Sequence, residues 1–484
     1  MKRIIAFLLM AAMLTSLAAC GTTPGGEETE ASETEAATDP VETRTPSGVP
    51  EGTTFDGASY NIGYFVSSAN YSYYLNDELT GDNMKDAVYR RARKVESTLD
   101  VKLSHEEDDL DPEVYRSLFK AGDDIYQELH FHIISNVADF VTGNLLYNVD
   151  TLPYMTLDAD WYNYEQMDAM RMGKNTYYIV SDYVIQNPAA IVFNQNMIVD
   201  NNLADPYELV KNGTWTMDNM VQMAIDVRND VNGDGEYTSE DDVYGIAIAE
   251  VSLSSPFLAG AGQLIGSRNP ETGLYEMTMN NENCYAALDK LYRLYEHPGS
   301  VNFNIVDFEY GTTLFYLGFA SDVEKSADIT EFSMGVVPFP KMDEEQEQYY
   351  SKDYSGPMAI PGTIKNPEMV GAVQELLAWE SGNEVVDTYY NKLLKTRYAT
   401  DPDARAMVEL IFDTVVYDVL GNYFGFKDGF CGLFYLASYP IHQGMNNYAA
   451  FFRPTKGLCK QTLATFYAEL EKVEGTAETE TAAE

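Results

Sequence analysis

A short acidic segment carries the clearest chemical pattern in the chain. Its oxygen-bearing side chains alternate as in a twelve-position EF-hand calcium loop, with Gly235 at the sixth position, where the backbone must turn sharply. The candidate metal ligands are Asp230, Asn232, Asp234, Glu236 through its backbone carbonyl, Thr238 and Asp241. Calcium takes about six to eight hard oxygen ligands, which such a loop can supply. We therefore expect a structural Ca²⁺ here.

A second interpretation of the same segment stays open. The run 232–235 reads Asn-Gly-Asp-Gly, which forms a tight turn without any ion. Asp241 occupies the last ligand position, where the longer Glu is usual, so bidentate ligation is less secure. Residues 243–247 have the pattern of a strand, so the second helix of an EF-hand does not follow. A structural ion in a loop is therefore favoured over a calcium switch.

The sequence lacks the short motifs of common enzymes. It contains no GxSxG, HExxH or P-loop pattern. Among its 5 histidines only His130 and His132 are closely spaced, and we interpret that pair as structural. With 76 acidic residues, carboxylate pairs arise by chance, so they give no support to a glycoside hydrolase. We predict that the protein is not an enzyme.

The N-terminus has the pattern of an export signal. Lys2 and Arg3 precede an apolar run over 4–17, which is too short to span a bilayer comfortably. The run ends in Leu-Ala-Ala-Cys-Gly at 17–21, which resembles the bacterial lipobox. That resemblance implies cleavage before Cys20 and lipidation of its thiol, and a plain signal peptide with an incidental cysteine is the alternative.

Three further cysteines remain, Cys284, Cys431 and Cys459, with no spacing typical of a zinc site. A Cys431–Cys459 disulfide and free buried thiols are both open.

The charge composition excludes some classes of binding partner. The 76 acids outnumber 31 basic residues and give a net charge of -45. Nucleic acids and anionic membrane surfaces both require basic protein surface, so neither is an expected partner of the folded part. A basic run over 90–94 lies in a predicted helix and is expected to be a solvated face. The hydrophobic fraction of 45% is sufficient for sizeable cores.

Strands and helices alternate in the first part of the folded region, and helices dominate its second half. Periodicity predicts strands over 59–66, 101–105, 128–135, 177–184, 189–193 and 333–338, and helices over 83–99, 217–227, 367–381, 384–394, 403–417 and 458–473. Thr216 is a suitable N-cap, and Trp215 has the spacing of a hydrophobic staple with Met220. The alternation favours an α/β fold with largely parallel strands.

Several motifs together resemble a known family. The lipobox, Trp-Thr-Met-Asp at 215–218 before a helix, the acidic loop followed by 242–246, Phe-Asn-Gln at 193–195, and 335–341 occur in an order similar to bacterial extracellular solute-binding lipoproteins of ABC importers, of the sugar-binding type (family 1). The likeness extends over about 54–470. It implies an α/β, two-lobed, type II periplasmic-binding-protein-like fold whose lobes close on a ligand.

By this analogy the chain divides into five parts. Residues 1–19 are expected to be the signal peptide and 20–53 a disordered, lipid-anchored linker. Lobe 1 is expected at 54–188 plus 310–352, and lobe 2 at 189–309 plus 353–472. A disordered acidic tail completes the chain at 473–484.

Ligands of open α/β sheets lie beyond the carboxyl ends of strands, which directs attention to the loops after Val66 and Ser135 and to the region of Asp182. Sugars require flat aromatic rings beside short polar groups. The residues that meet these conditions are Tyr71, Tyr73, Asn136, Trp161, Asp182, Phe257 and Tyr354. Each residue taken alone is also compatible with a purely structural role.

The resemblance implies a substrate-binding lipoprotein on the extracellular face of the cell membrane. It would capture a solute, with an oligosaccharide favoured and a peptide or amino-sugar fragment still open, and deliver it to ABC permease subunits. The alternative is a surface glycan-binding or adhesion lipoprotein that works without a transporter.

Overall fold

The computed structural model describes residues 47–64, 74–105, 112–131, 136–238, 242–248, 254–302, 305–320, 332–356, 358–389, 401–425, 430 and 444–481. Contacts divide the chain into two units, Met1–Ser47 and Gly48–Glu484, and the second is described here by itself. The predicted signal peptide, Cys20 and the linker up to residue 46 lie outside the described residues. No helix within the described ranges is long and apolar enough to cross a membrane.

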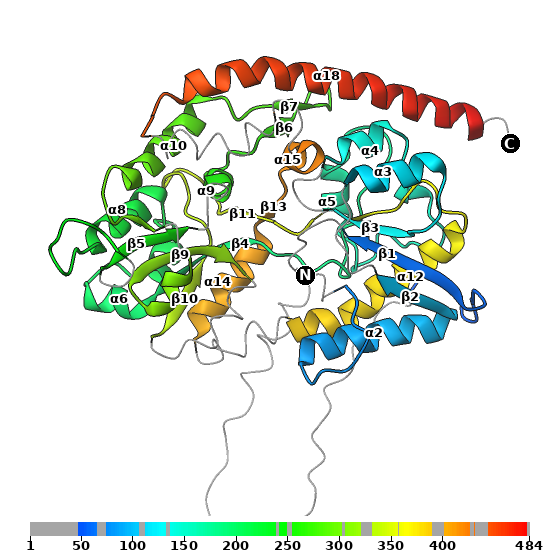
Figure 1. Ribbon diagram of the computed structural model, residues 1–484, viewed down its shortest axis with the longest axis horizontal. Coiled ribbons are helices and arrows are strands. Elements are labelled where there is room, and N and C mark those ends of the chain that lie inside the picture. The colour runs from blue at the N-terminus through cyan, green and yellow to red at the C-terminus, as the bar shows by residue number, and fades with distance from the viewer. Residues whose placement is uncertain are drawn as a thin grey trace, which may run out of the picture. The chain divides into compact units, whose positions relative to one another are not determined.

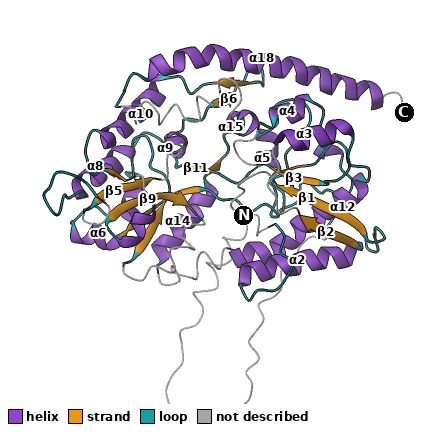
Figure 2. Ribbon diagram, viewed as in Figure 1, coloured by secondary structure: helices purple, strands orange, loops and turns teal. Residues whose placement is uncertain are grey.

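The first sheet forms the centre of one half of this unit, here called lobe 1 (Figures 1 and 2). Its strands, in spatial order, are β12 (Met358–Ala359), β3 (Glu128–His130), β1 (Ala58–Tyr64) and β2 (Val101–His105). β1 runs parallel to β2 and β3, while β12 is antiparallel to β3. Helices α2 (Asn83–Leu99) and α12 (Pro367–Glu380) pack against each other and bury their apolar side chains in the same core.

The second sheet forms the centre of lobe 2. Its strands, in spatial order, are β10 (Met334–Val337), β4 (Ala189–Asn194), β9 (Thr313–Phe319), β5 (Tyr244–Ile248) and β8 (Val301–Asn302). β4 is antiparallel to β9 and β10, whereas β5 is parallel to β8 and β9. Helix α8 (Met217–Val227) packs on β5 and on α10 (Glu282–Tyr295).

The remaining elements connect or cover these sheets. They are α3 (Pro112–Ala121), α4 (Ala138–Thr142), η3 (Val149–Thr151), α5 (Tyr164–Ala169), α6 (Gln195–Asp200), α7 (Pro206–Lys211), α9 (Ser254–Gly260), β6 (Gly266–Arg268), β7 (Tyr275–Met277), η4 (Ile305–Tyr310), β11 (Ser351–Lys352), the π-helical turn η6 (Ser381–Val385), α14 (Pro402–Asp413), β13 (Val415–Val416), α15 (Val419–Phe424) and α18 (Tyr448–Thr481).

The predicted division into lobes requires correction. The stretch 310–352 was expected in lobe 1, but its strands β9 and β10 belong to the second sheet, where β9 lies between β4 and β5. The stretch that follows was expected in lobe 2, yet β12 joins the first sheet and α12 packs on α2. The reason is that strand pairing is decided by partners far away in sequence, which local patterns do not report.

Helices and strands with strong local signals agree with the sequence residue for residue. α2, β2 and α8 have their predicted bounds. The Thr216 hydroxyl caps α8 by accepting from the Asn219 N–H at 3.4 Å. Trp215 is fully buried, and its indole N–H donates to the Pro338 carbonyl at 2.8 Å. Trp215 is therefore a packing residue.

Four local predictions differ from the structure. The helix predicted over 403–417 ends at Asp413, and Val415–Val416 form β13. Segment 177–184 forms no strand and makes only single bridges, Ile179 to Met358 and Ser181 to Tyr162. The predicted helix at 384–394 is a continuation of α12 through η6 as far as 389, and 390–394 lie outside the described residues. The tail from 473 is helical, because α18 runs to Thr481. Cys284 and Cys459 are buried free thiols, and Cys431 lies outside the described residues.

A substitution at Gly245 of β5 tests how tightly lobe 2 is packed. A Cβ at this position would lie 2.1 Å from the Ala224 carbonyl oxygen and 2.8 Å from that of Ser300. Because both obstacles are backbone atoms, Gly245→Ala should lower the free energy of unfolding by about 3 kcal/mol in chemical denaturation. The control is Gly457→Ala on the exposed face of α18, where a Cβ meets nothing within 4 Å. It should stabilise the protein by about 0.5–1 kcal/mol, and equal losses for both variants would contradict this packing.

Candidate functional site

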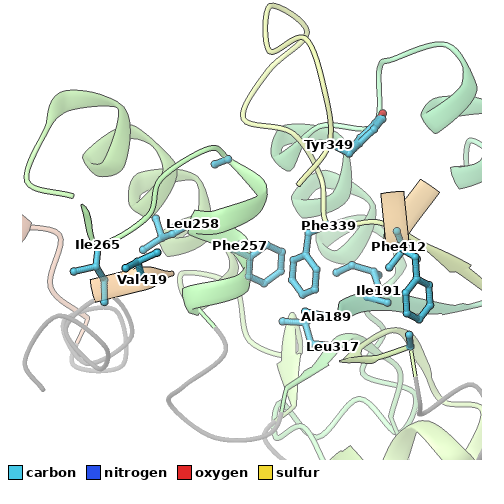
Figure 3. Close-up of a cluster of buried hydrophobic side chains, with 14 of the residues drawn as sticks. Ala189, Ile191, Phe257, Leu258, Ile265, Leu317, Phe339, Tyr349, Phe412 and Val419 are labelled. Carbon is cyan, nitrogen blue, oxygen red and sulfur yellow. The ribbon is translucent and has the colours of Figure 1, made fainter. Parts of the chain in front are cut away.

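Two predicted ligand residues lie in hydrophobic cores. Phe257 of α9 is 1% exposed, with its ring centre 5.0 Å from that of Phe339, and Figure 3 shows it between Phe339 and Leu258. Trp161 is also 1% exposed and belongs to the core of lobe 1. Both rings bury their apolar surface in a core, and the prediction that they contact ligand stays untested.

The other predicted ligand residues are dispersed. Tyr71 and Tyr73 lie outside the described residues. Asn136 donates to the Asp139 carboxylate at 2.6 Å at the start of α4. The backbone N–H of half-buried Asp182 donates to the Trp161 carbonyl at 2.9 Å. Only Tyr354 lies in the segment where the two lobes join.

Aromatic side chains gather where parallel strands of lobe 1 end. Tyr64 ends β1 and His130 ends β3, so both stand at the carboxyl edge of the sheet. The Tyr74 ring centre lies 3.9 Å from that of His130 and 5.7 Å from that of Tyr64. His105 and Tyr183 complete this group, here called the edge cluster. The edge is the one predicted for a ligand, although these residues were not among the candidates.

A buried carboxylate holds the edge cluster in place. Glu128 of β3 is fully buried and accepts from Tyr183 Oη at 2.8 Å and Tyr60 Oη at 2.9 Å. Gln374 of α12 donates to it at 2.6 Å, and His130 Nε2 also contacts it. Multiple hydrogen bonds are what a carboxylate requires to remain inside a core. The network therefore fixes the orientation of both Tyr183 and His130.

Arg91 supplies the positive charge beside this network. It is 1% exposed, donates to Ser381 Oγ at 2.9 Å and to the Tyr74 carbonyl, and lies 4.8 Å from the centre of the Tyr183 ring. Burial lowers the pKa of Arg91. Its neighbours Arg90 and Lys94 pair with Glu384 and Glu380 beside η6. The side chains of Arg90 and Lys94 are 51% and 57% exposed, so the predicted solvated face is confirmed for these two and is wrong for Arg91.

Among the described residues, three chain crossings between the lobes bond to one another. The crossings are 186–188, 351–356 and 415–418. Pro188 and Asp353 form an antiparallel bridge, the Tyr354 N–H donates to the Asn187 carbonyl at 3.2 Å, and β11 pairs with β13. We call this region the hinge. Its own backbone hydrogen bonds make it a small sheet-like joint.

Asp353 is the buried acid of the hinge. It is 2% exposed and accepts from the Asn187 N–H at 2.9 Å and from Ser355 Oγ. Burial raises its pKa to about 6, against the lowering effect of these hydrogen bonds. Burial, and secondarily the nearby Asp353 carboxylate, also raises the pKa of Tyr417. Tyr417 in turn accepts from Gln186 Nε2 at 2.5 Å.

A pocket opens beside Asp353. Its cavity volume is about 20 Å³, which is room for about one water molecule, and the empty space amounts to about 300 Å³ when open solvent is counted. Its lining residues are Met170, Ile179, Val180, Val184, Gln186, Ser355, Gly356, Tyr417 and Asn422. Apolar side chains with a few neutral hydrogen-bonding groups are the composition expected for a neutral, partly apolar ligand. Sequence reasoning missed Gln186, Tyr417 and Asn422, because only the folded joint brings them together.

The nearby buried cation is already neutralised. Lys352 is 2% exposed, donates to Ser255 Oγ at 2.7 Å and lies 3.6 Å from the Asp418 carboxylate. Burial lowers the pKa of Lys352. Its ammonium group also lies 5.3 Å from the Tyr354 ring centre. Lys352 and Arg91 therefore serve internal contacts.

The acidic loop is closed by its own backbone. Asp230 accepts from the N–H groups of Gly233 at 2.7 Å and Gly235 at 2.8 Å. Asp242, which is fully buried and was not predicted, accepts from Val231 N–H at 2.9 Å and Thr238 N–H at 2.8 Å. Among the residues that the structure describes, which exclude Asp241, no three His, Cys, Asp or Glu side chains converge as a metal site. Calcium binding stays a prediction.

Asp353 makes stability depend on pH in a defined direction. Its pKa is about 6 in the fold and about 3.9 in an unfolded chain, so the folded protein binds the proton more tightly. The group thus contributes stability below pH 4 that is lost as pH rises through 6, by roughly 3 kcal/mol. Asp353→Asn removes this titrating group. In denaturant unfolding, the free energy of unfolding of the variant minus that of the wild type should therefore increase by about this amount from pH 4 to pH 7. A difference that does not change with pH would contradict the assignment.

Comparison with known proteins identifies the fold. No protein-family model and no curated protein matches the sequence. An ABC substrate-binding protein of Listeria monocytogenes in complex with cycloalternan matches with TM-score 0.53 and 13% identity, over 87% of this chain and 100% of its own. A Thermotoga lettingae ABC transporter solute-binding protein bound with alpha-D-tagatose gives 0.54 and 13%, over 84% and 100%. The GacH receptor of Streptomyces glaucescens gives 0.51 and 14%, over 86% and 99%. The chain therefore has the two-lobed, type II periplasmic-binding-protein-like α/β fold of these solute-binding proteins.

Proposed function

We propose that this protein captures a neutral carbohydrate, favoured to be an oligosaccharide, between its two lobes and delivers it to an ABC permease. The observation that carries the proposal is the hinge pocket. Both lobes line it, it combines apolar walls with Gln186, Tyr417 and Asn422, and it lies beside the joint about which the lobes can move. A ligand held there would favour one arrangement of the lobes over others.

The chemistry of the region favours a sugar over a charged solute. A bound anion requires a cation to compensate its charge, and Arg91 and Lys352 are engaged in internal contacts. Sugars instead present apolar faces and hydroxyl groups, which aromatic rings and amide side chains match. The ligands of the structural neighbours, cycloalternan, tagatose and acarbose, agree with this class.

The proposal extends to location. An export signal with Cys20 lipidated would hold the protein at the extracellular face of the membrane, where tethering raises its effective concentration near a permease. Delivery requires no chemistry by the protein, so we propose a binding protein and not an enzyme. A surface glycan-binding lipoprotein without a transporter is the second candidate, and the neutral pocket suits it equally well.

Binding of a neutral oligosaccharide is tested by calorimetry after a thermal-shift screen. Maltotetraose, cycloalternan and tagatose are the neutral probes, and galacturonic acid and a tripeptide are the contrasts. Ligand at about 100 times Kd should stabilise the fold by about 2.7 kcal/mol. Gln186→Ala should weaken the binding of a positive probe at least about tenfold, since about 1.4 kcal/mol of contact free energy corresponds to that factor.

The control is Gln222→Ala, which removes an exposed glutamine on α8 of lobe 2 and should leave Kd unchanged. Stabilisation by the anionic probe alone would overturn the neutral-solute proposal. Binding only to an insoluble surface glycan would favour the adhesion candidate.

We propose as a separate point that the loop 230–241 holds a structural Ca²⁺. Support comes from its spacing of oxygen ligands and from Gly235, whose φ of +83° gives the turn such a loop needs. Removing calcium with EGTA should lower Tm, and Asp234→Ala should abolish that sensitivity. The control Asp226→Ala on α8 should retain it. No change in Tm on chelation would leave the loop as a turn held by its own hydrogen bonds.

A further inference from the structure

The C-terminal helix α18 contacts both lobes. It packs on α10 and β7 of lobe 2 and on α4 of lobe 1. Figure 1 shows it extending from above α10 past α4, so it spans the molecule on the side where α15 lies. These contacts are separate from the three crossings of the hinge. A second connection between the lobes therefore exists.

One part of α18 is fixed to lobe 2 and to α15. The Tyr448 hydroxyl donates to the Leu288 carbonyl of α10 at 3.1 Å. The Tyr467 hydroxyl accepts from the Tyr275 N–H of β7 at 2.7 Å. Phe466 is buried, with its ring centre 5.2 Å from that of Phe424 in α15. Apolar burial of this kind makes the first part of α18 a firm attachment.

The other end of α18 is held to lobe 1 by a carboxylate. Glu474 is 6% exposed and accepts from the backbone N–H groups of Lys174 at 2.9 Å and Asn175 at 3.0 Å. A Cβ at Gly173 would lie 2.5 Å from Glu474 Oε1, so this approach requires glycine. Hydrogen bonds to an ionised acceptor are roughly twice as strong as neutral ones.

The segment that Glu474 holds is an integral part of lobe 1. The N–H of Thr176 donates to Asn148 Oδ1 at 3.2 Å, and the N–H of Val149 donates to the Thr176 carbonyl at 2.8 Å. Tyr147, which precedes Asn148, bonds to the residue that follows β12, because its N–H donates to the Ile360 carbonyl at 2.8 Å. A displacement of 173–175 is thus a displacement of lobe 1.

A cation from lobe 2 binds the same segment of lobe 1. Arg268 of β6 donates through Nη2 to the carbonyls of Asp168 at 2.8 Å and Arg171 at 2.7 Å, at the C-terminal end of α5. The Tyr275 hydroxyl donates to the Ala169 carbonyl. A cation at the carbonyl end of a helix and an anion at the following N–H groups are each favourable. Lobe 2 and α18 thus bind 168–175 with complementary charges.

We propose that Arg268 and Glu474 form a clasp through which the hairpin β6–β7 and α18 restrain the movement of the two lobes. The hinge allows rotation, and the clasp opposes it, because separating the lobes on this side must break charge-assisted hydrogen bonds to 168–175. The clasp is non-covalent, so it limits the range of lobe positions without preventing movement. It acts with or without ligand, and it does not depend on the identity of the solute.

The experiment measures lobe separation in the full chain without ligand. Genetically encoded spin-labelled residues at Lys102 of β2 and Val199 of α6, both exposed, report the distance distribution by pulsed electron resonance. The double variant Arg268→Ala with Glu474→Ala should broaden this distribution and shift its mean. Amide exchange at Lys174 and Asn175, followed by mass spectrometry, should be at least about tenfold faster. Glu471→Ala, an exposed acid on the same helix, should change neither quantity.

If the double variant does not fold, Glu474→Gln serves in its place, because it keeps the size of the side chain and removes its charge. Faster amide exchange with an unchanged distance distribution would overturn the proposal, since the contacts would then be local. Unchanged exchange would overturn it as well. Because no sugar is present, neither result depends on whether the protein binds carbohydrate.

Discussion

Asp353 occupies the place where the chain passes between its two sheets, and its burial constrains the whole arrangement. The carboxylate is satisfied by the Asn187 N–H of one crossing and by Ser355 of the next, while Tyr417 of the third lies nearby. Any large change in the joint would leave a buried charge without its donors, which is costly. These contacts therefore hold the crossings together as one unit. The pocket lies at this joint, and Gln186, Ser355 and Tyr417 of the three crossings line it.

Lobe 1 carries a second buried charge centre that serves the same region. Glu128 orients Tyr183 and His130, and Arg91 supports Tyr183 from the other side. These contacts fix the buried rings of Tyr74, His130 and Tyr183 at the carboxyl edge of the first sheet. The chain from Tyr183 continues directly into the first crossing at 186–188. The edge cluster and the hinge are thus adjacent in sequence.

Local patterns predicted the elements whose causes are local. The cap at Thr216 and the apolar periodicity of 83–99 fixed α8 and α2 within the sequence itself. The assignment of β9 and β10 to a lobe depended on pairing with β4, more than a hundred residues away. Glu474 seemed part of an acidic tail because its donors, Lys174 and Asn175, are about 300 residues distant. Phe257 and Trp161 were attractive as sugar-stacking rings, but large aromatic side chains gain most from burial.

The central claim is that a neutral carbohydrate is held between the lobes and changes their relative position. Small-angle X-ray scattering of the full chain, with and without a saturating oligosaccharide identified by calorimetry, tests this claim most directly. The account predicts a smaller radius of gyration in the complex, with a change that Gln186→Ala shifts to higher ligand concentration. A sugar that binds with the expected heat while the radius of gyration stays the same would contradict it.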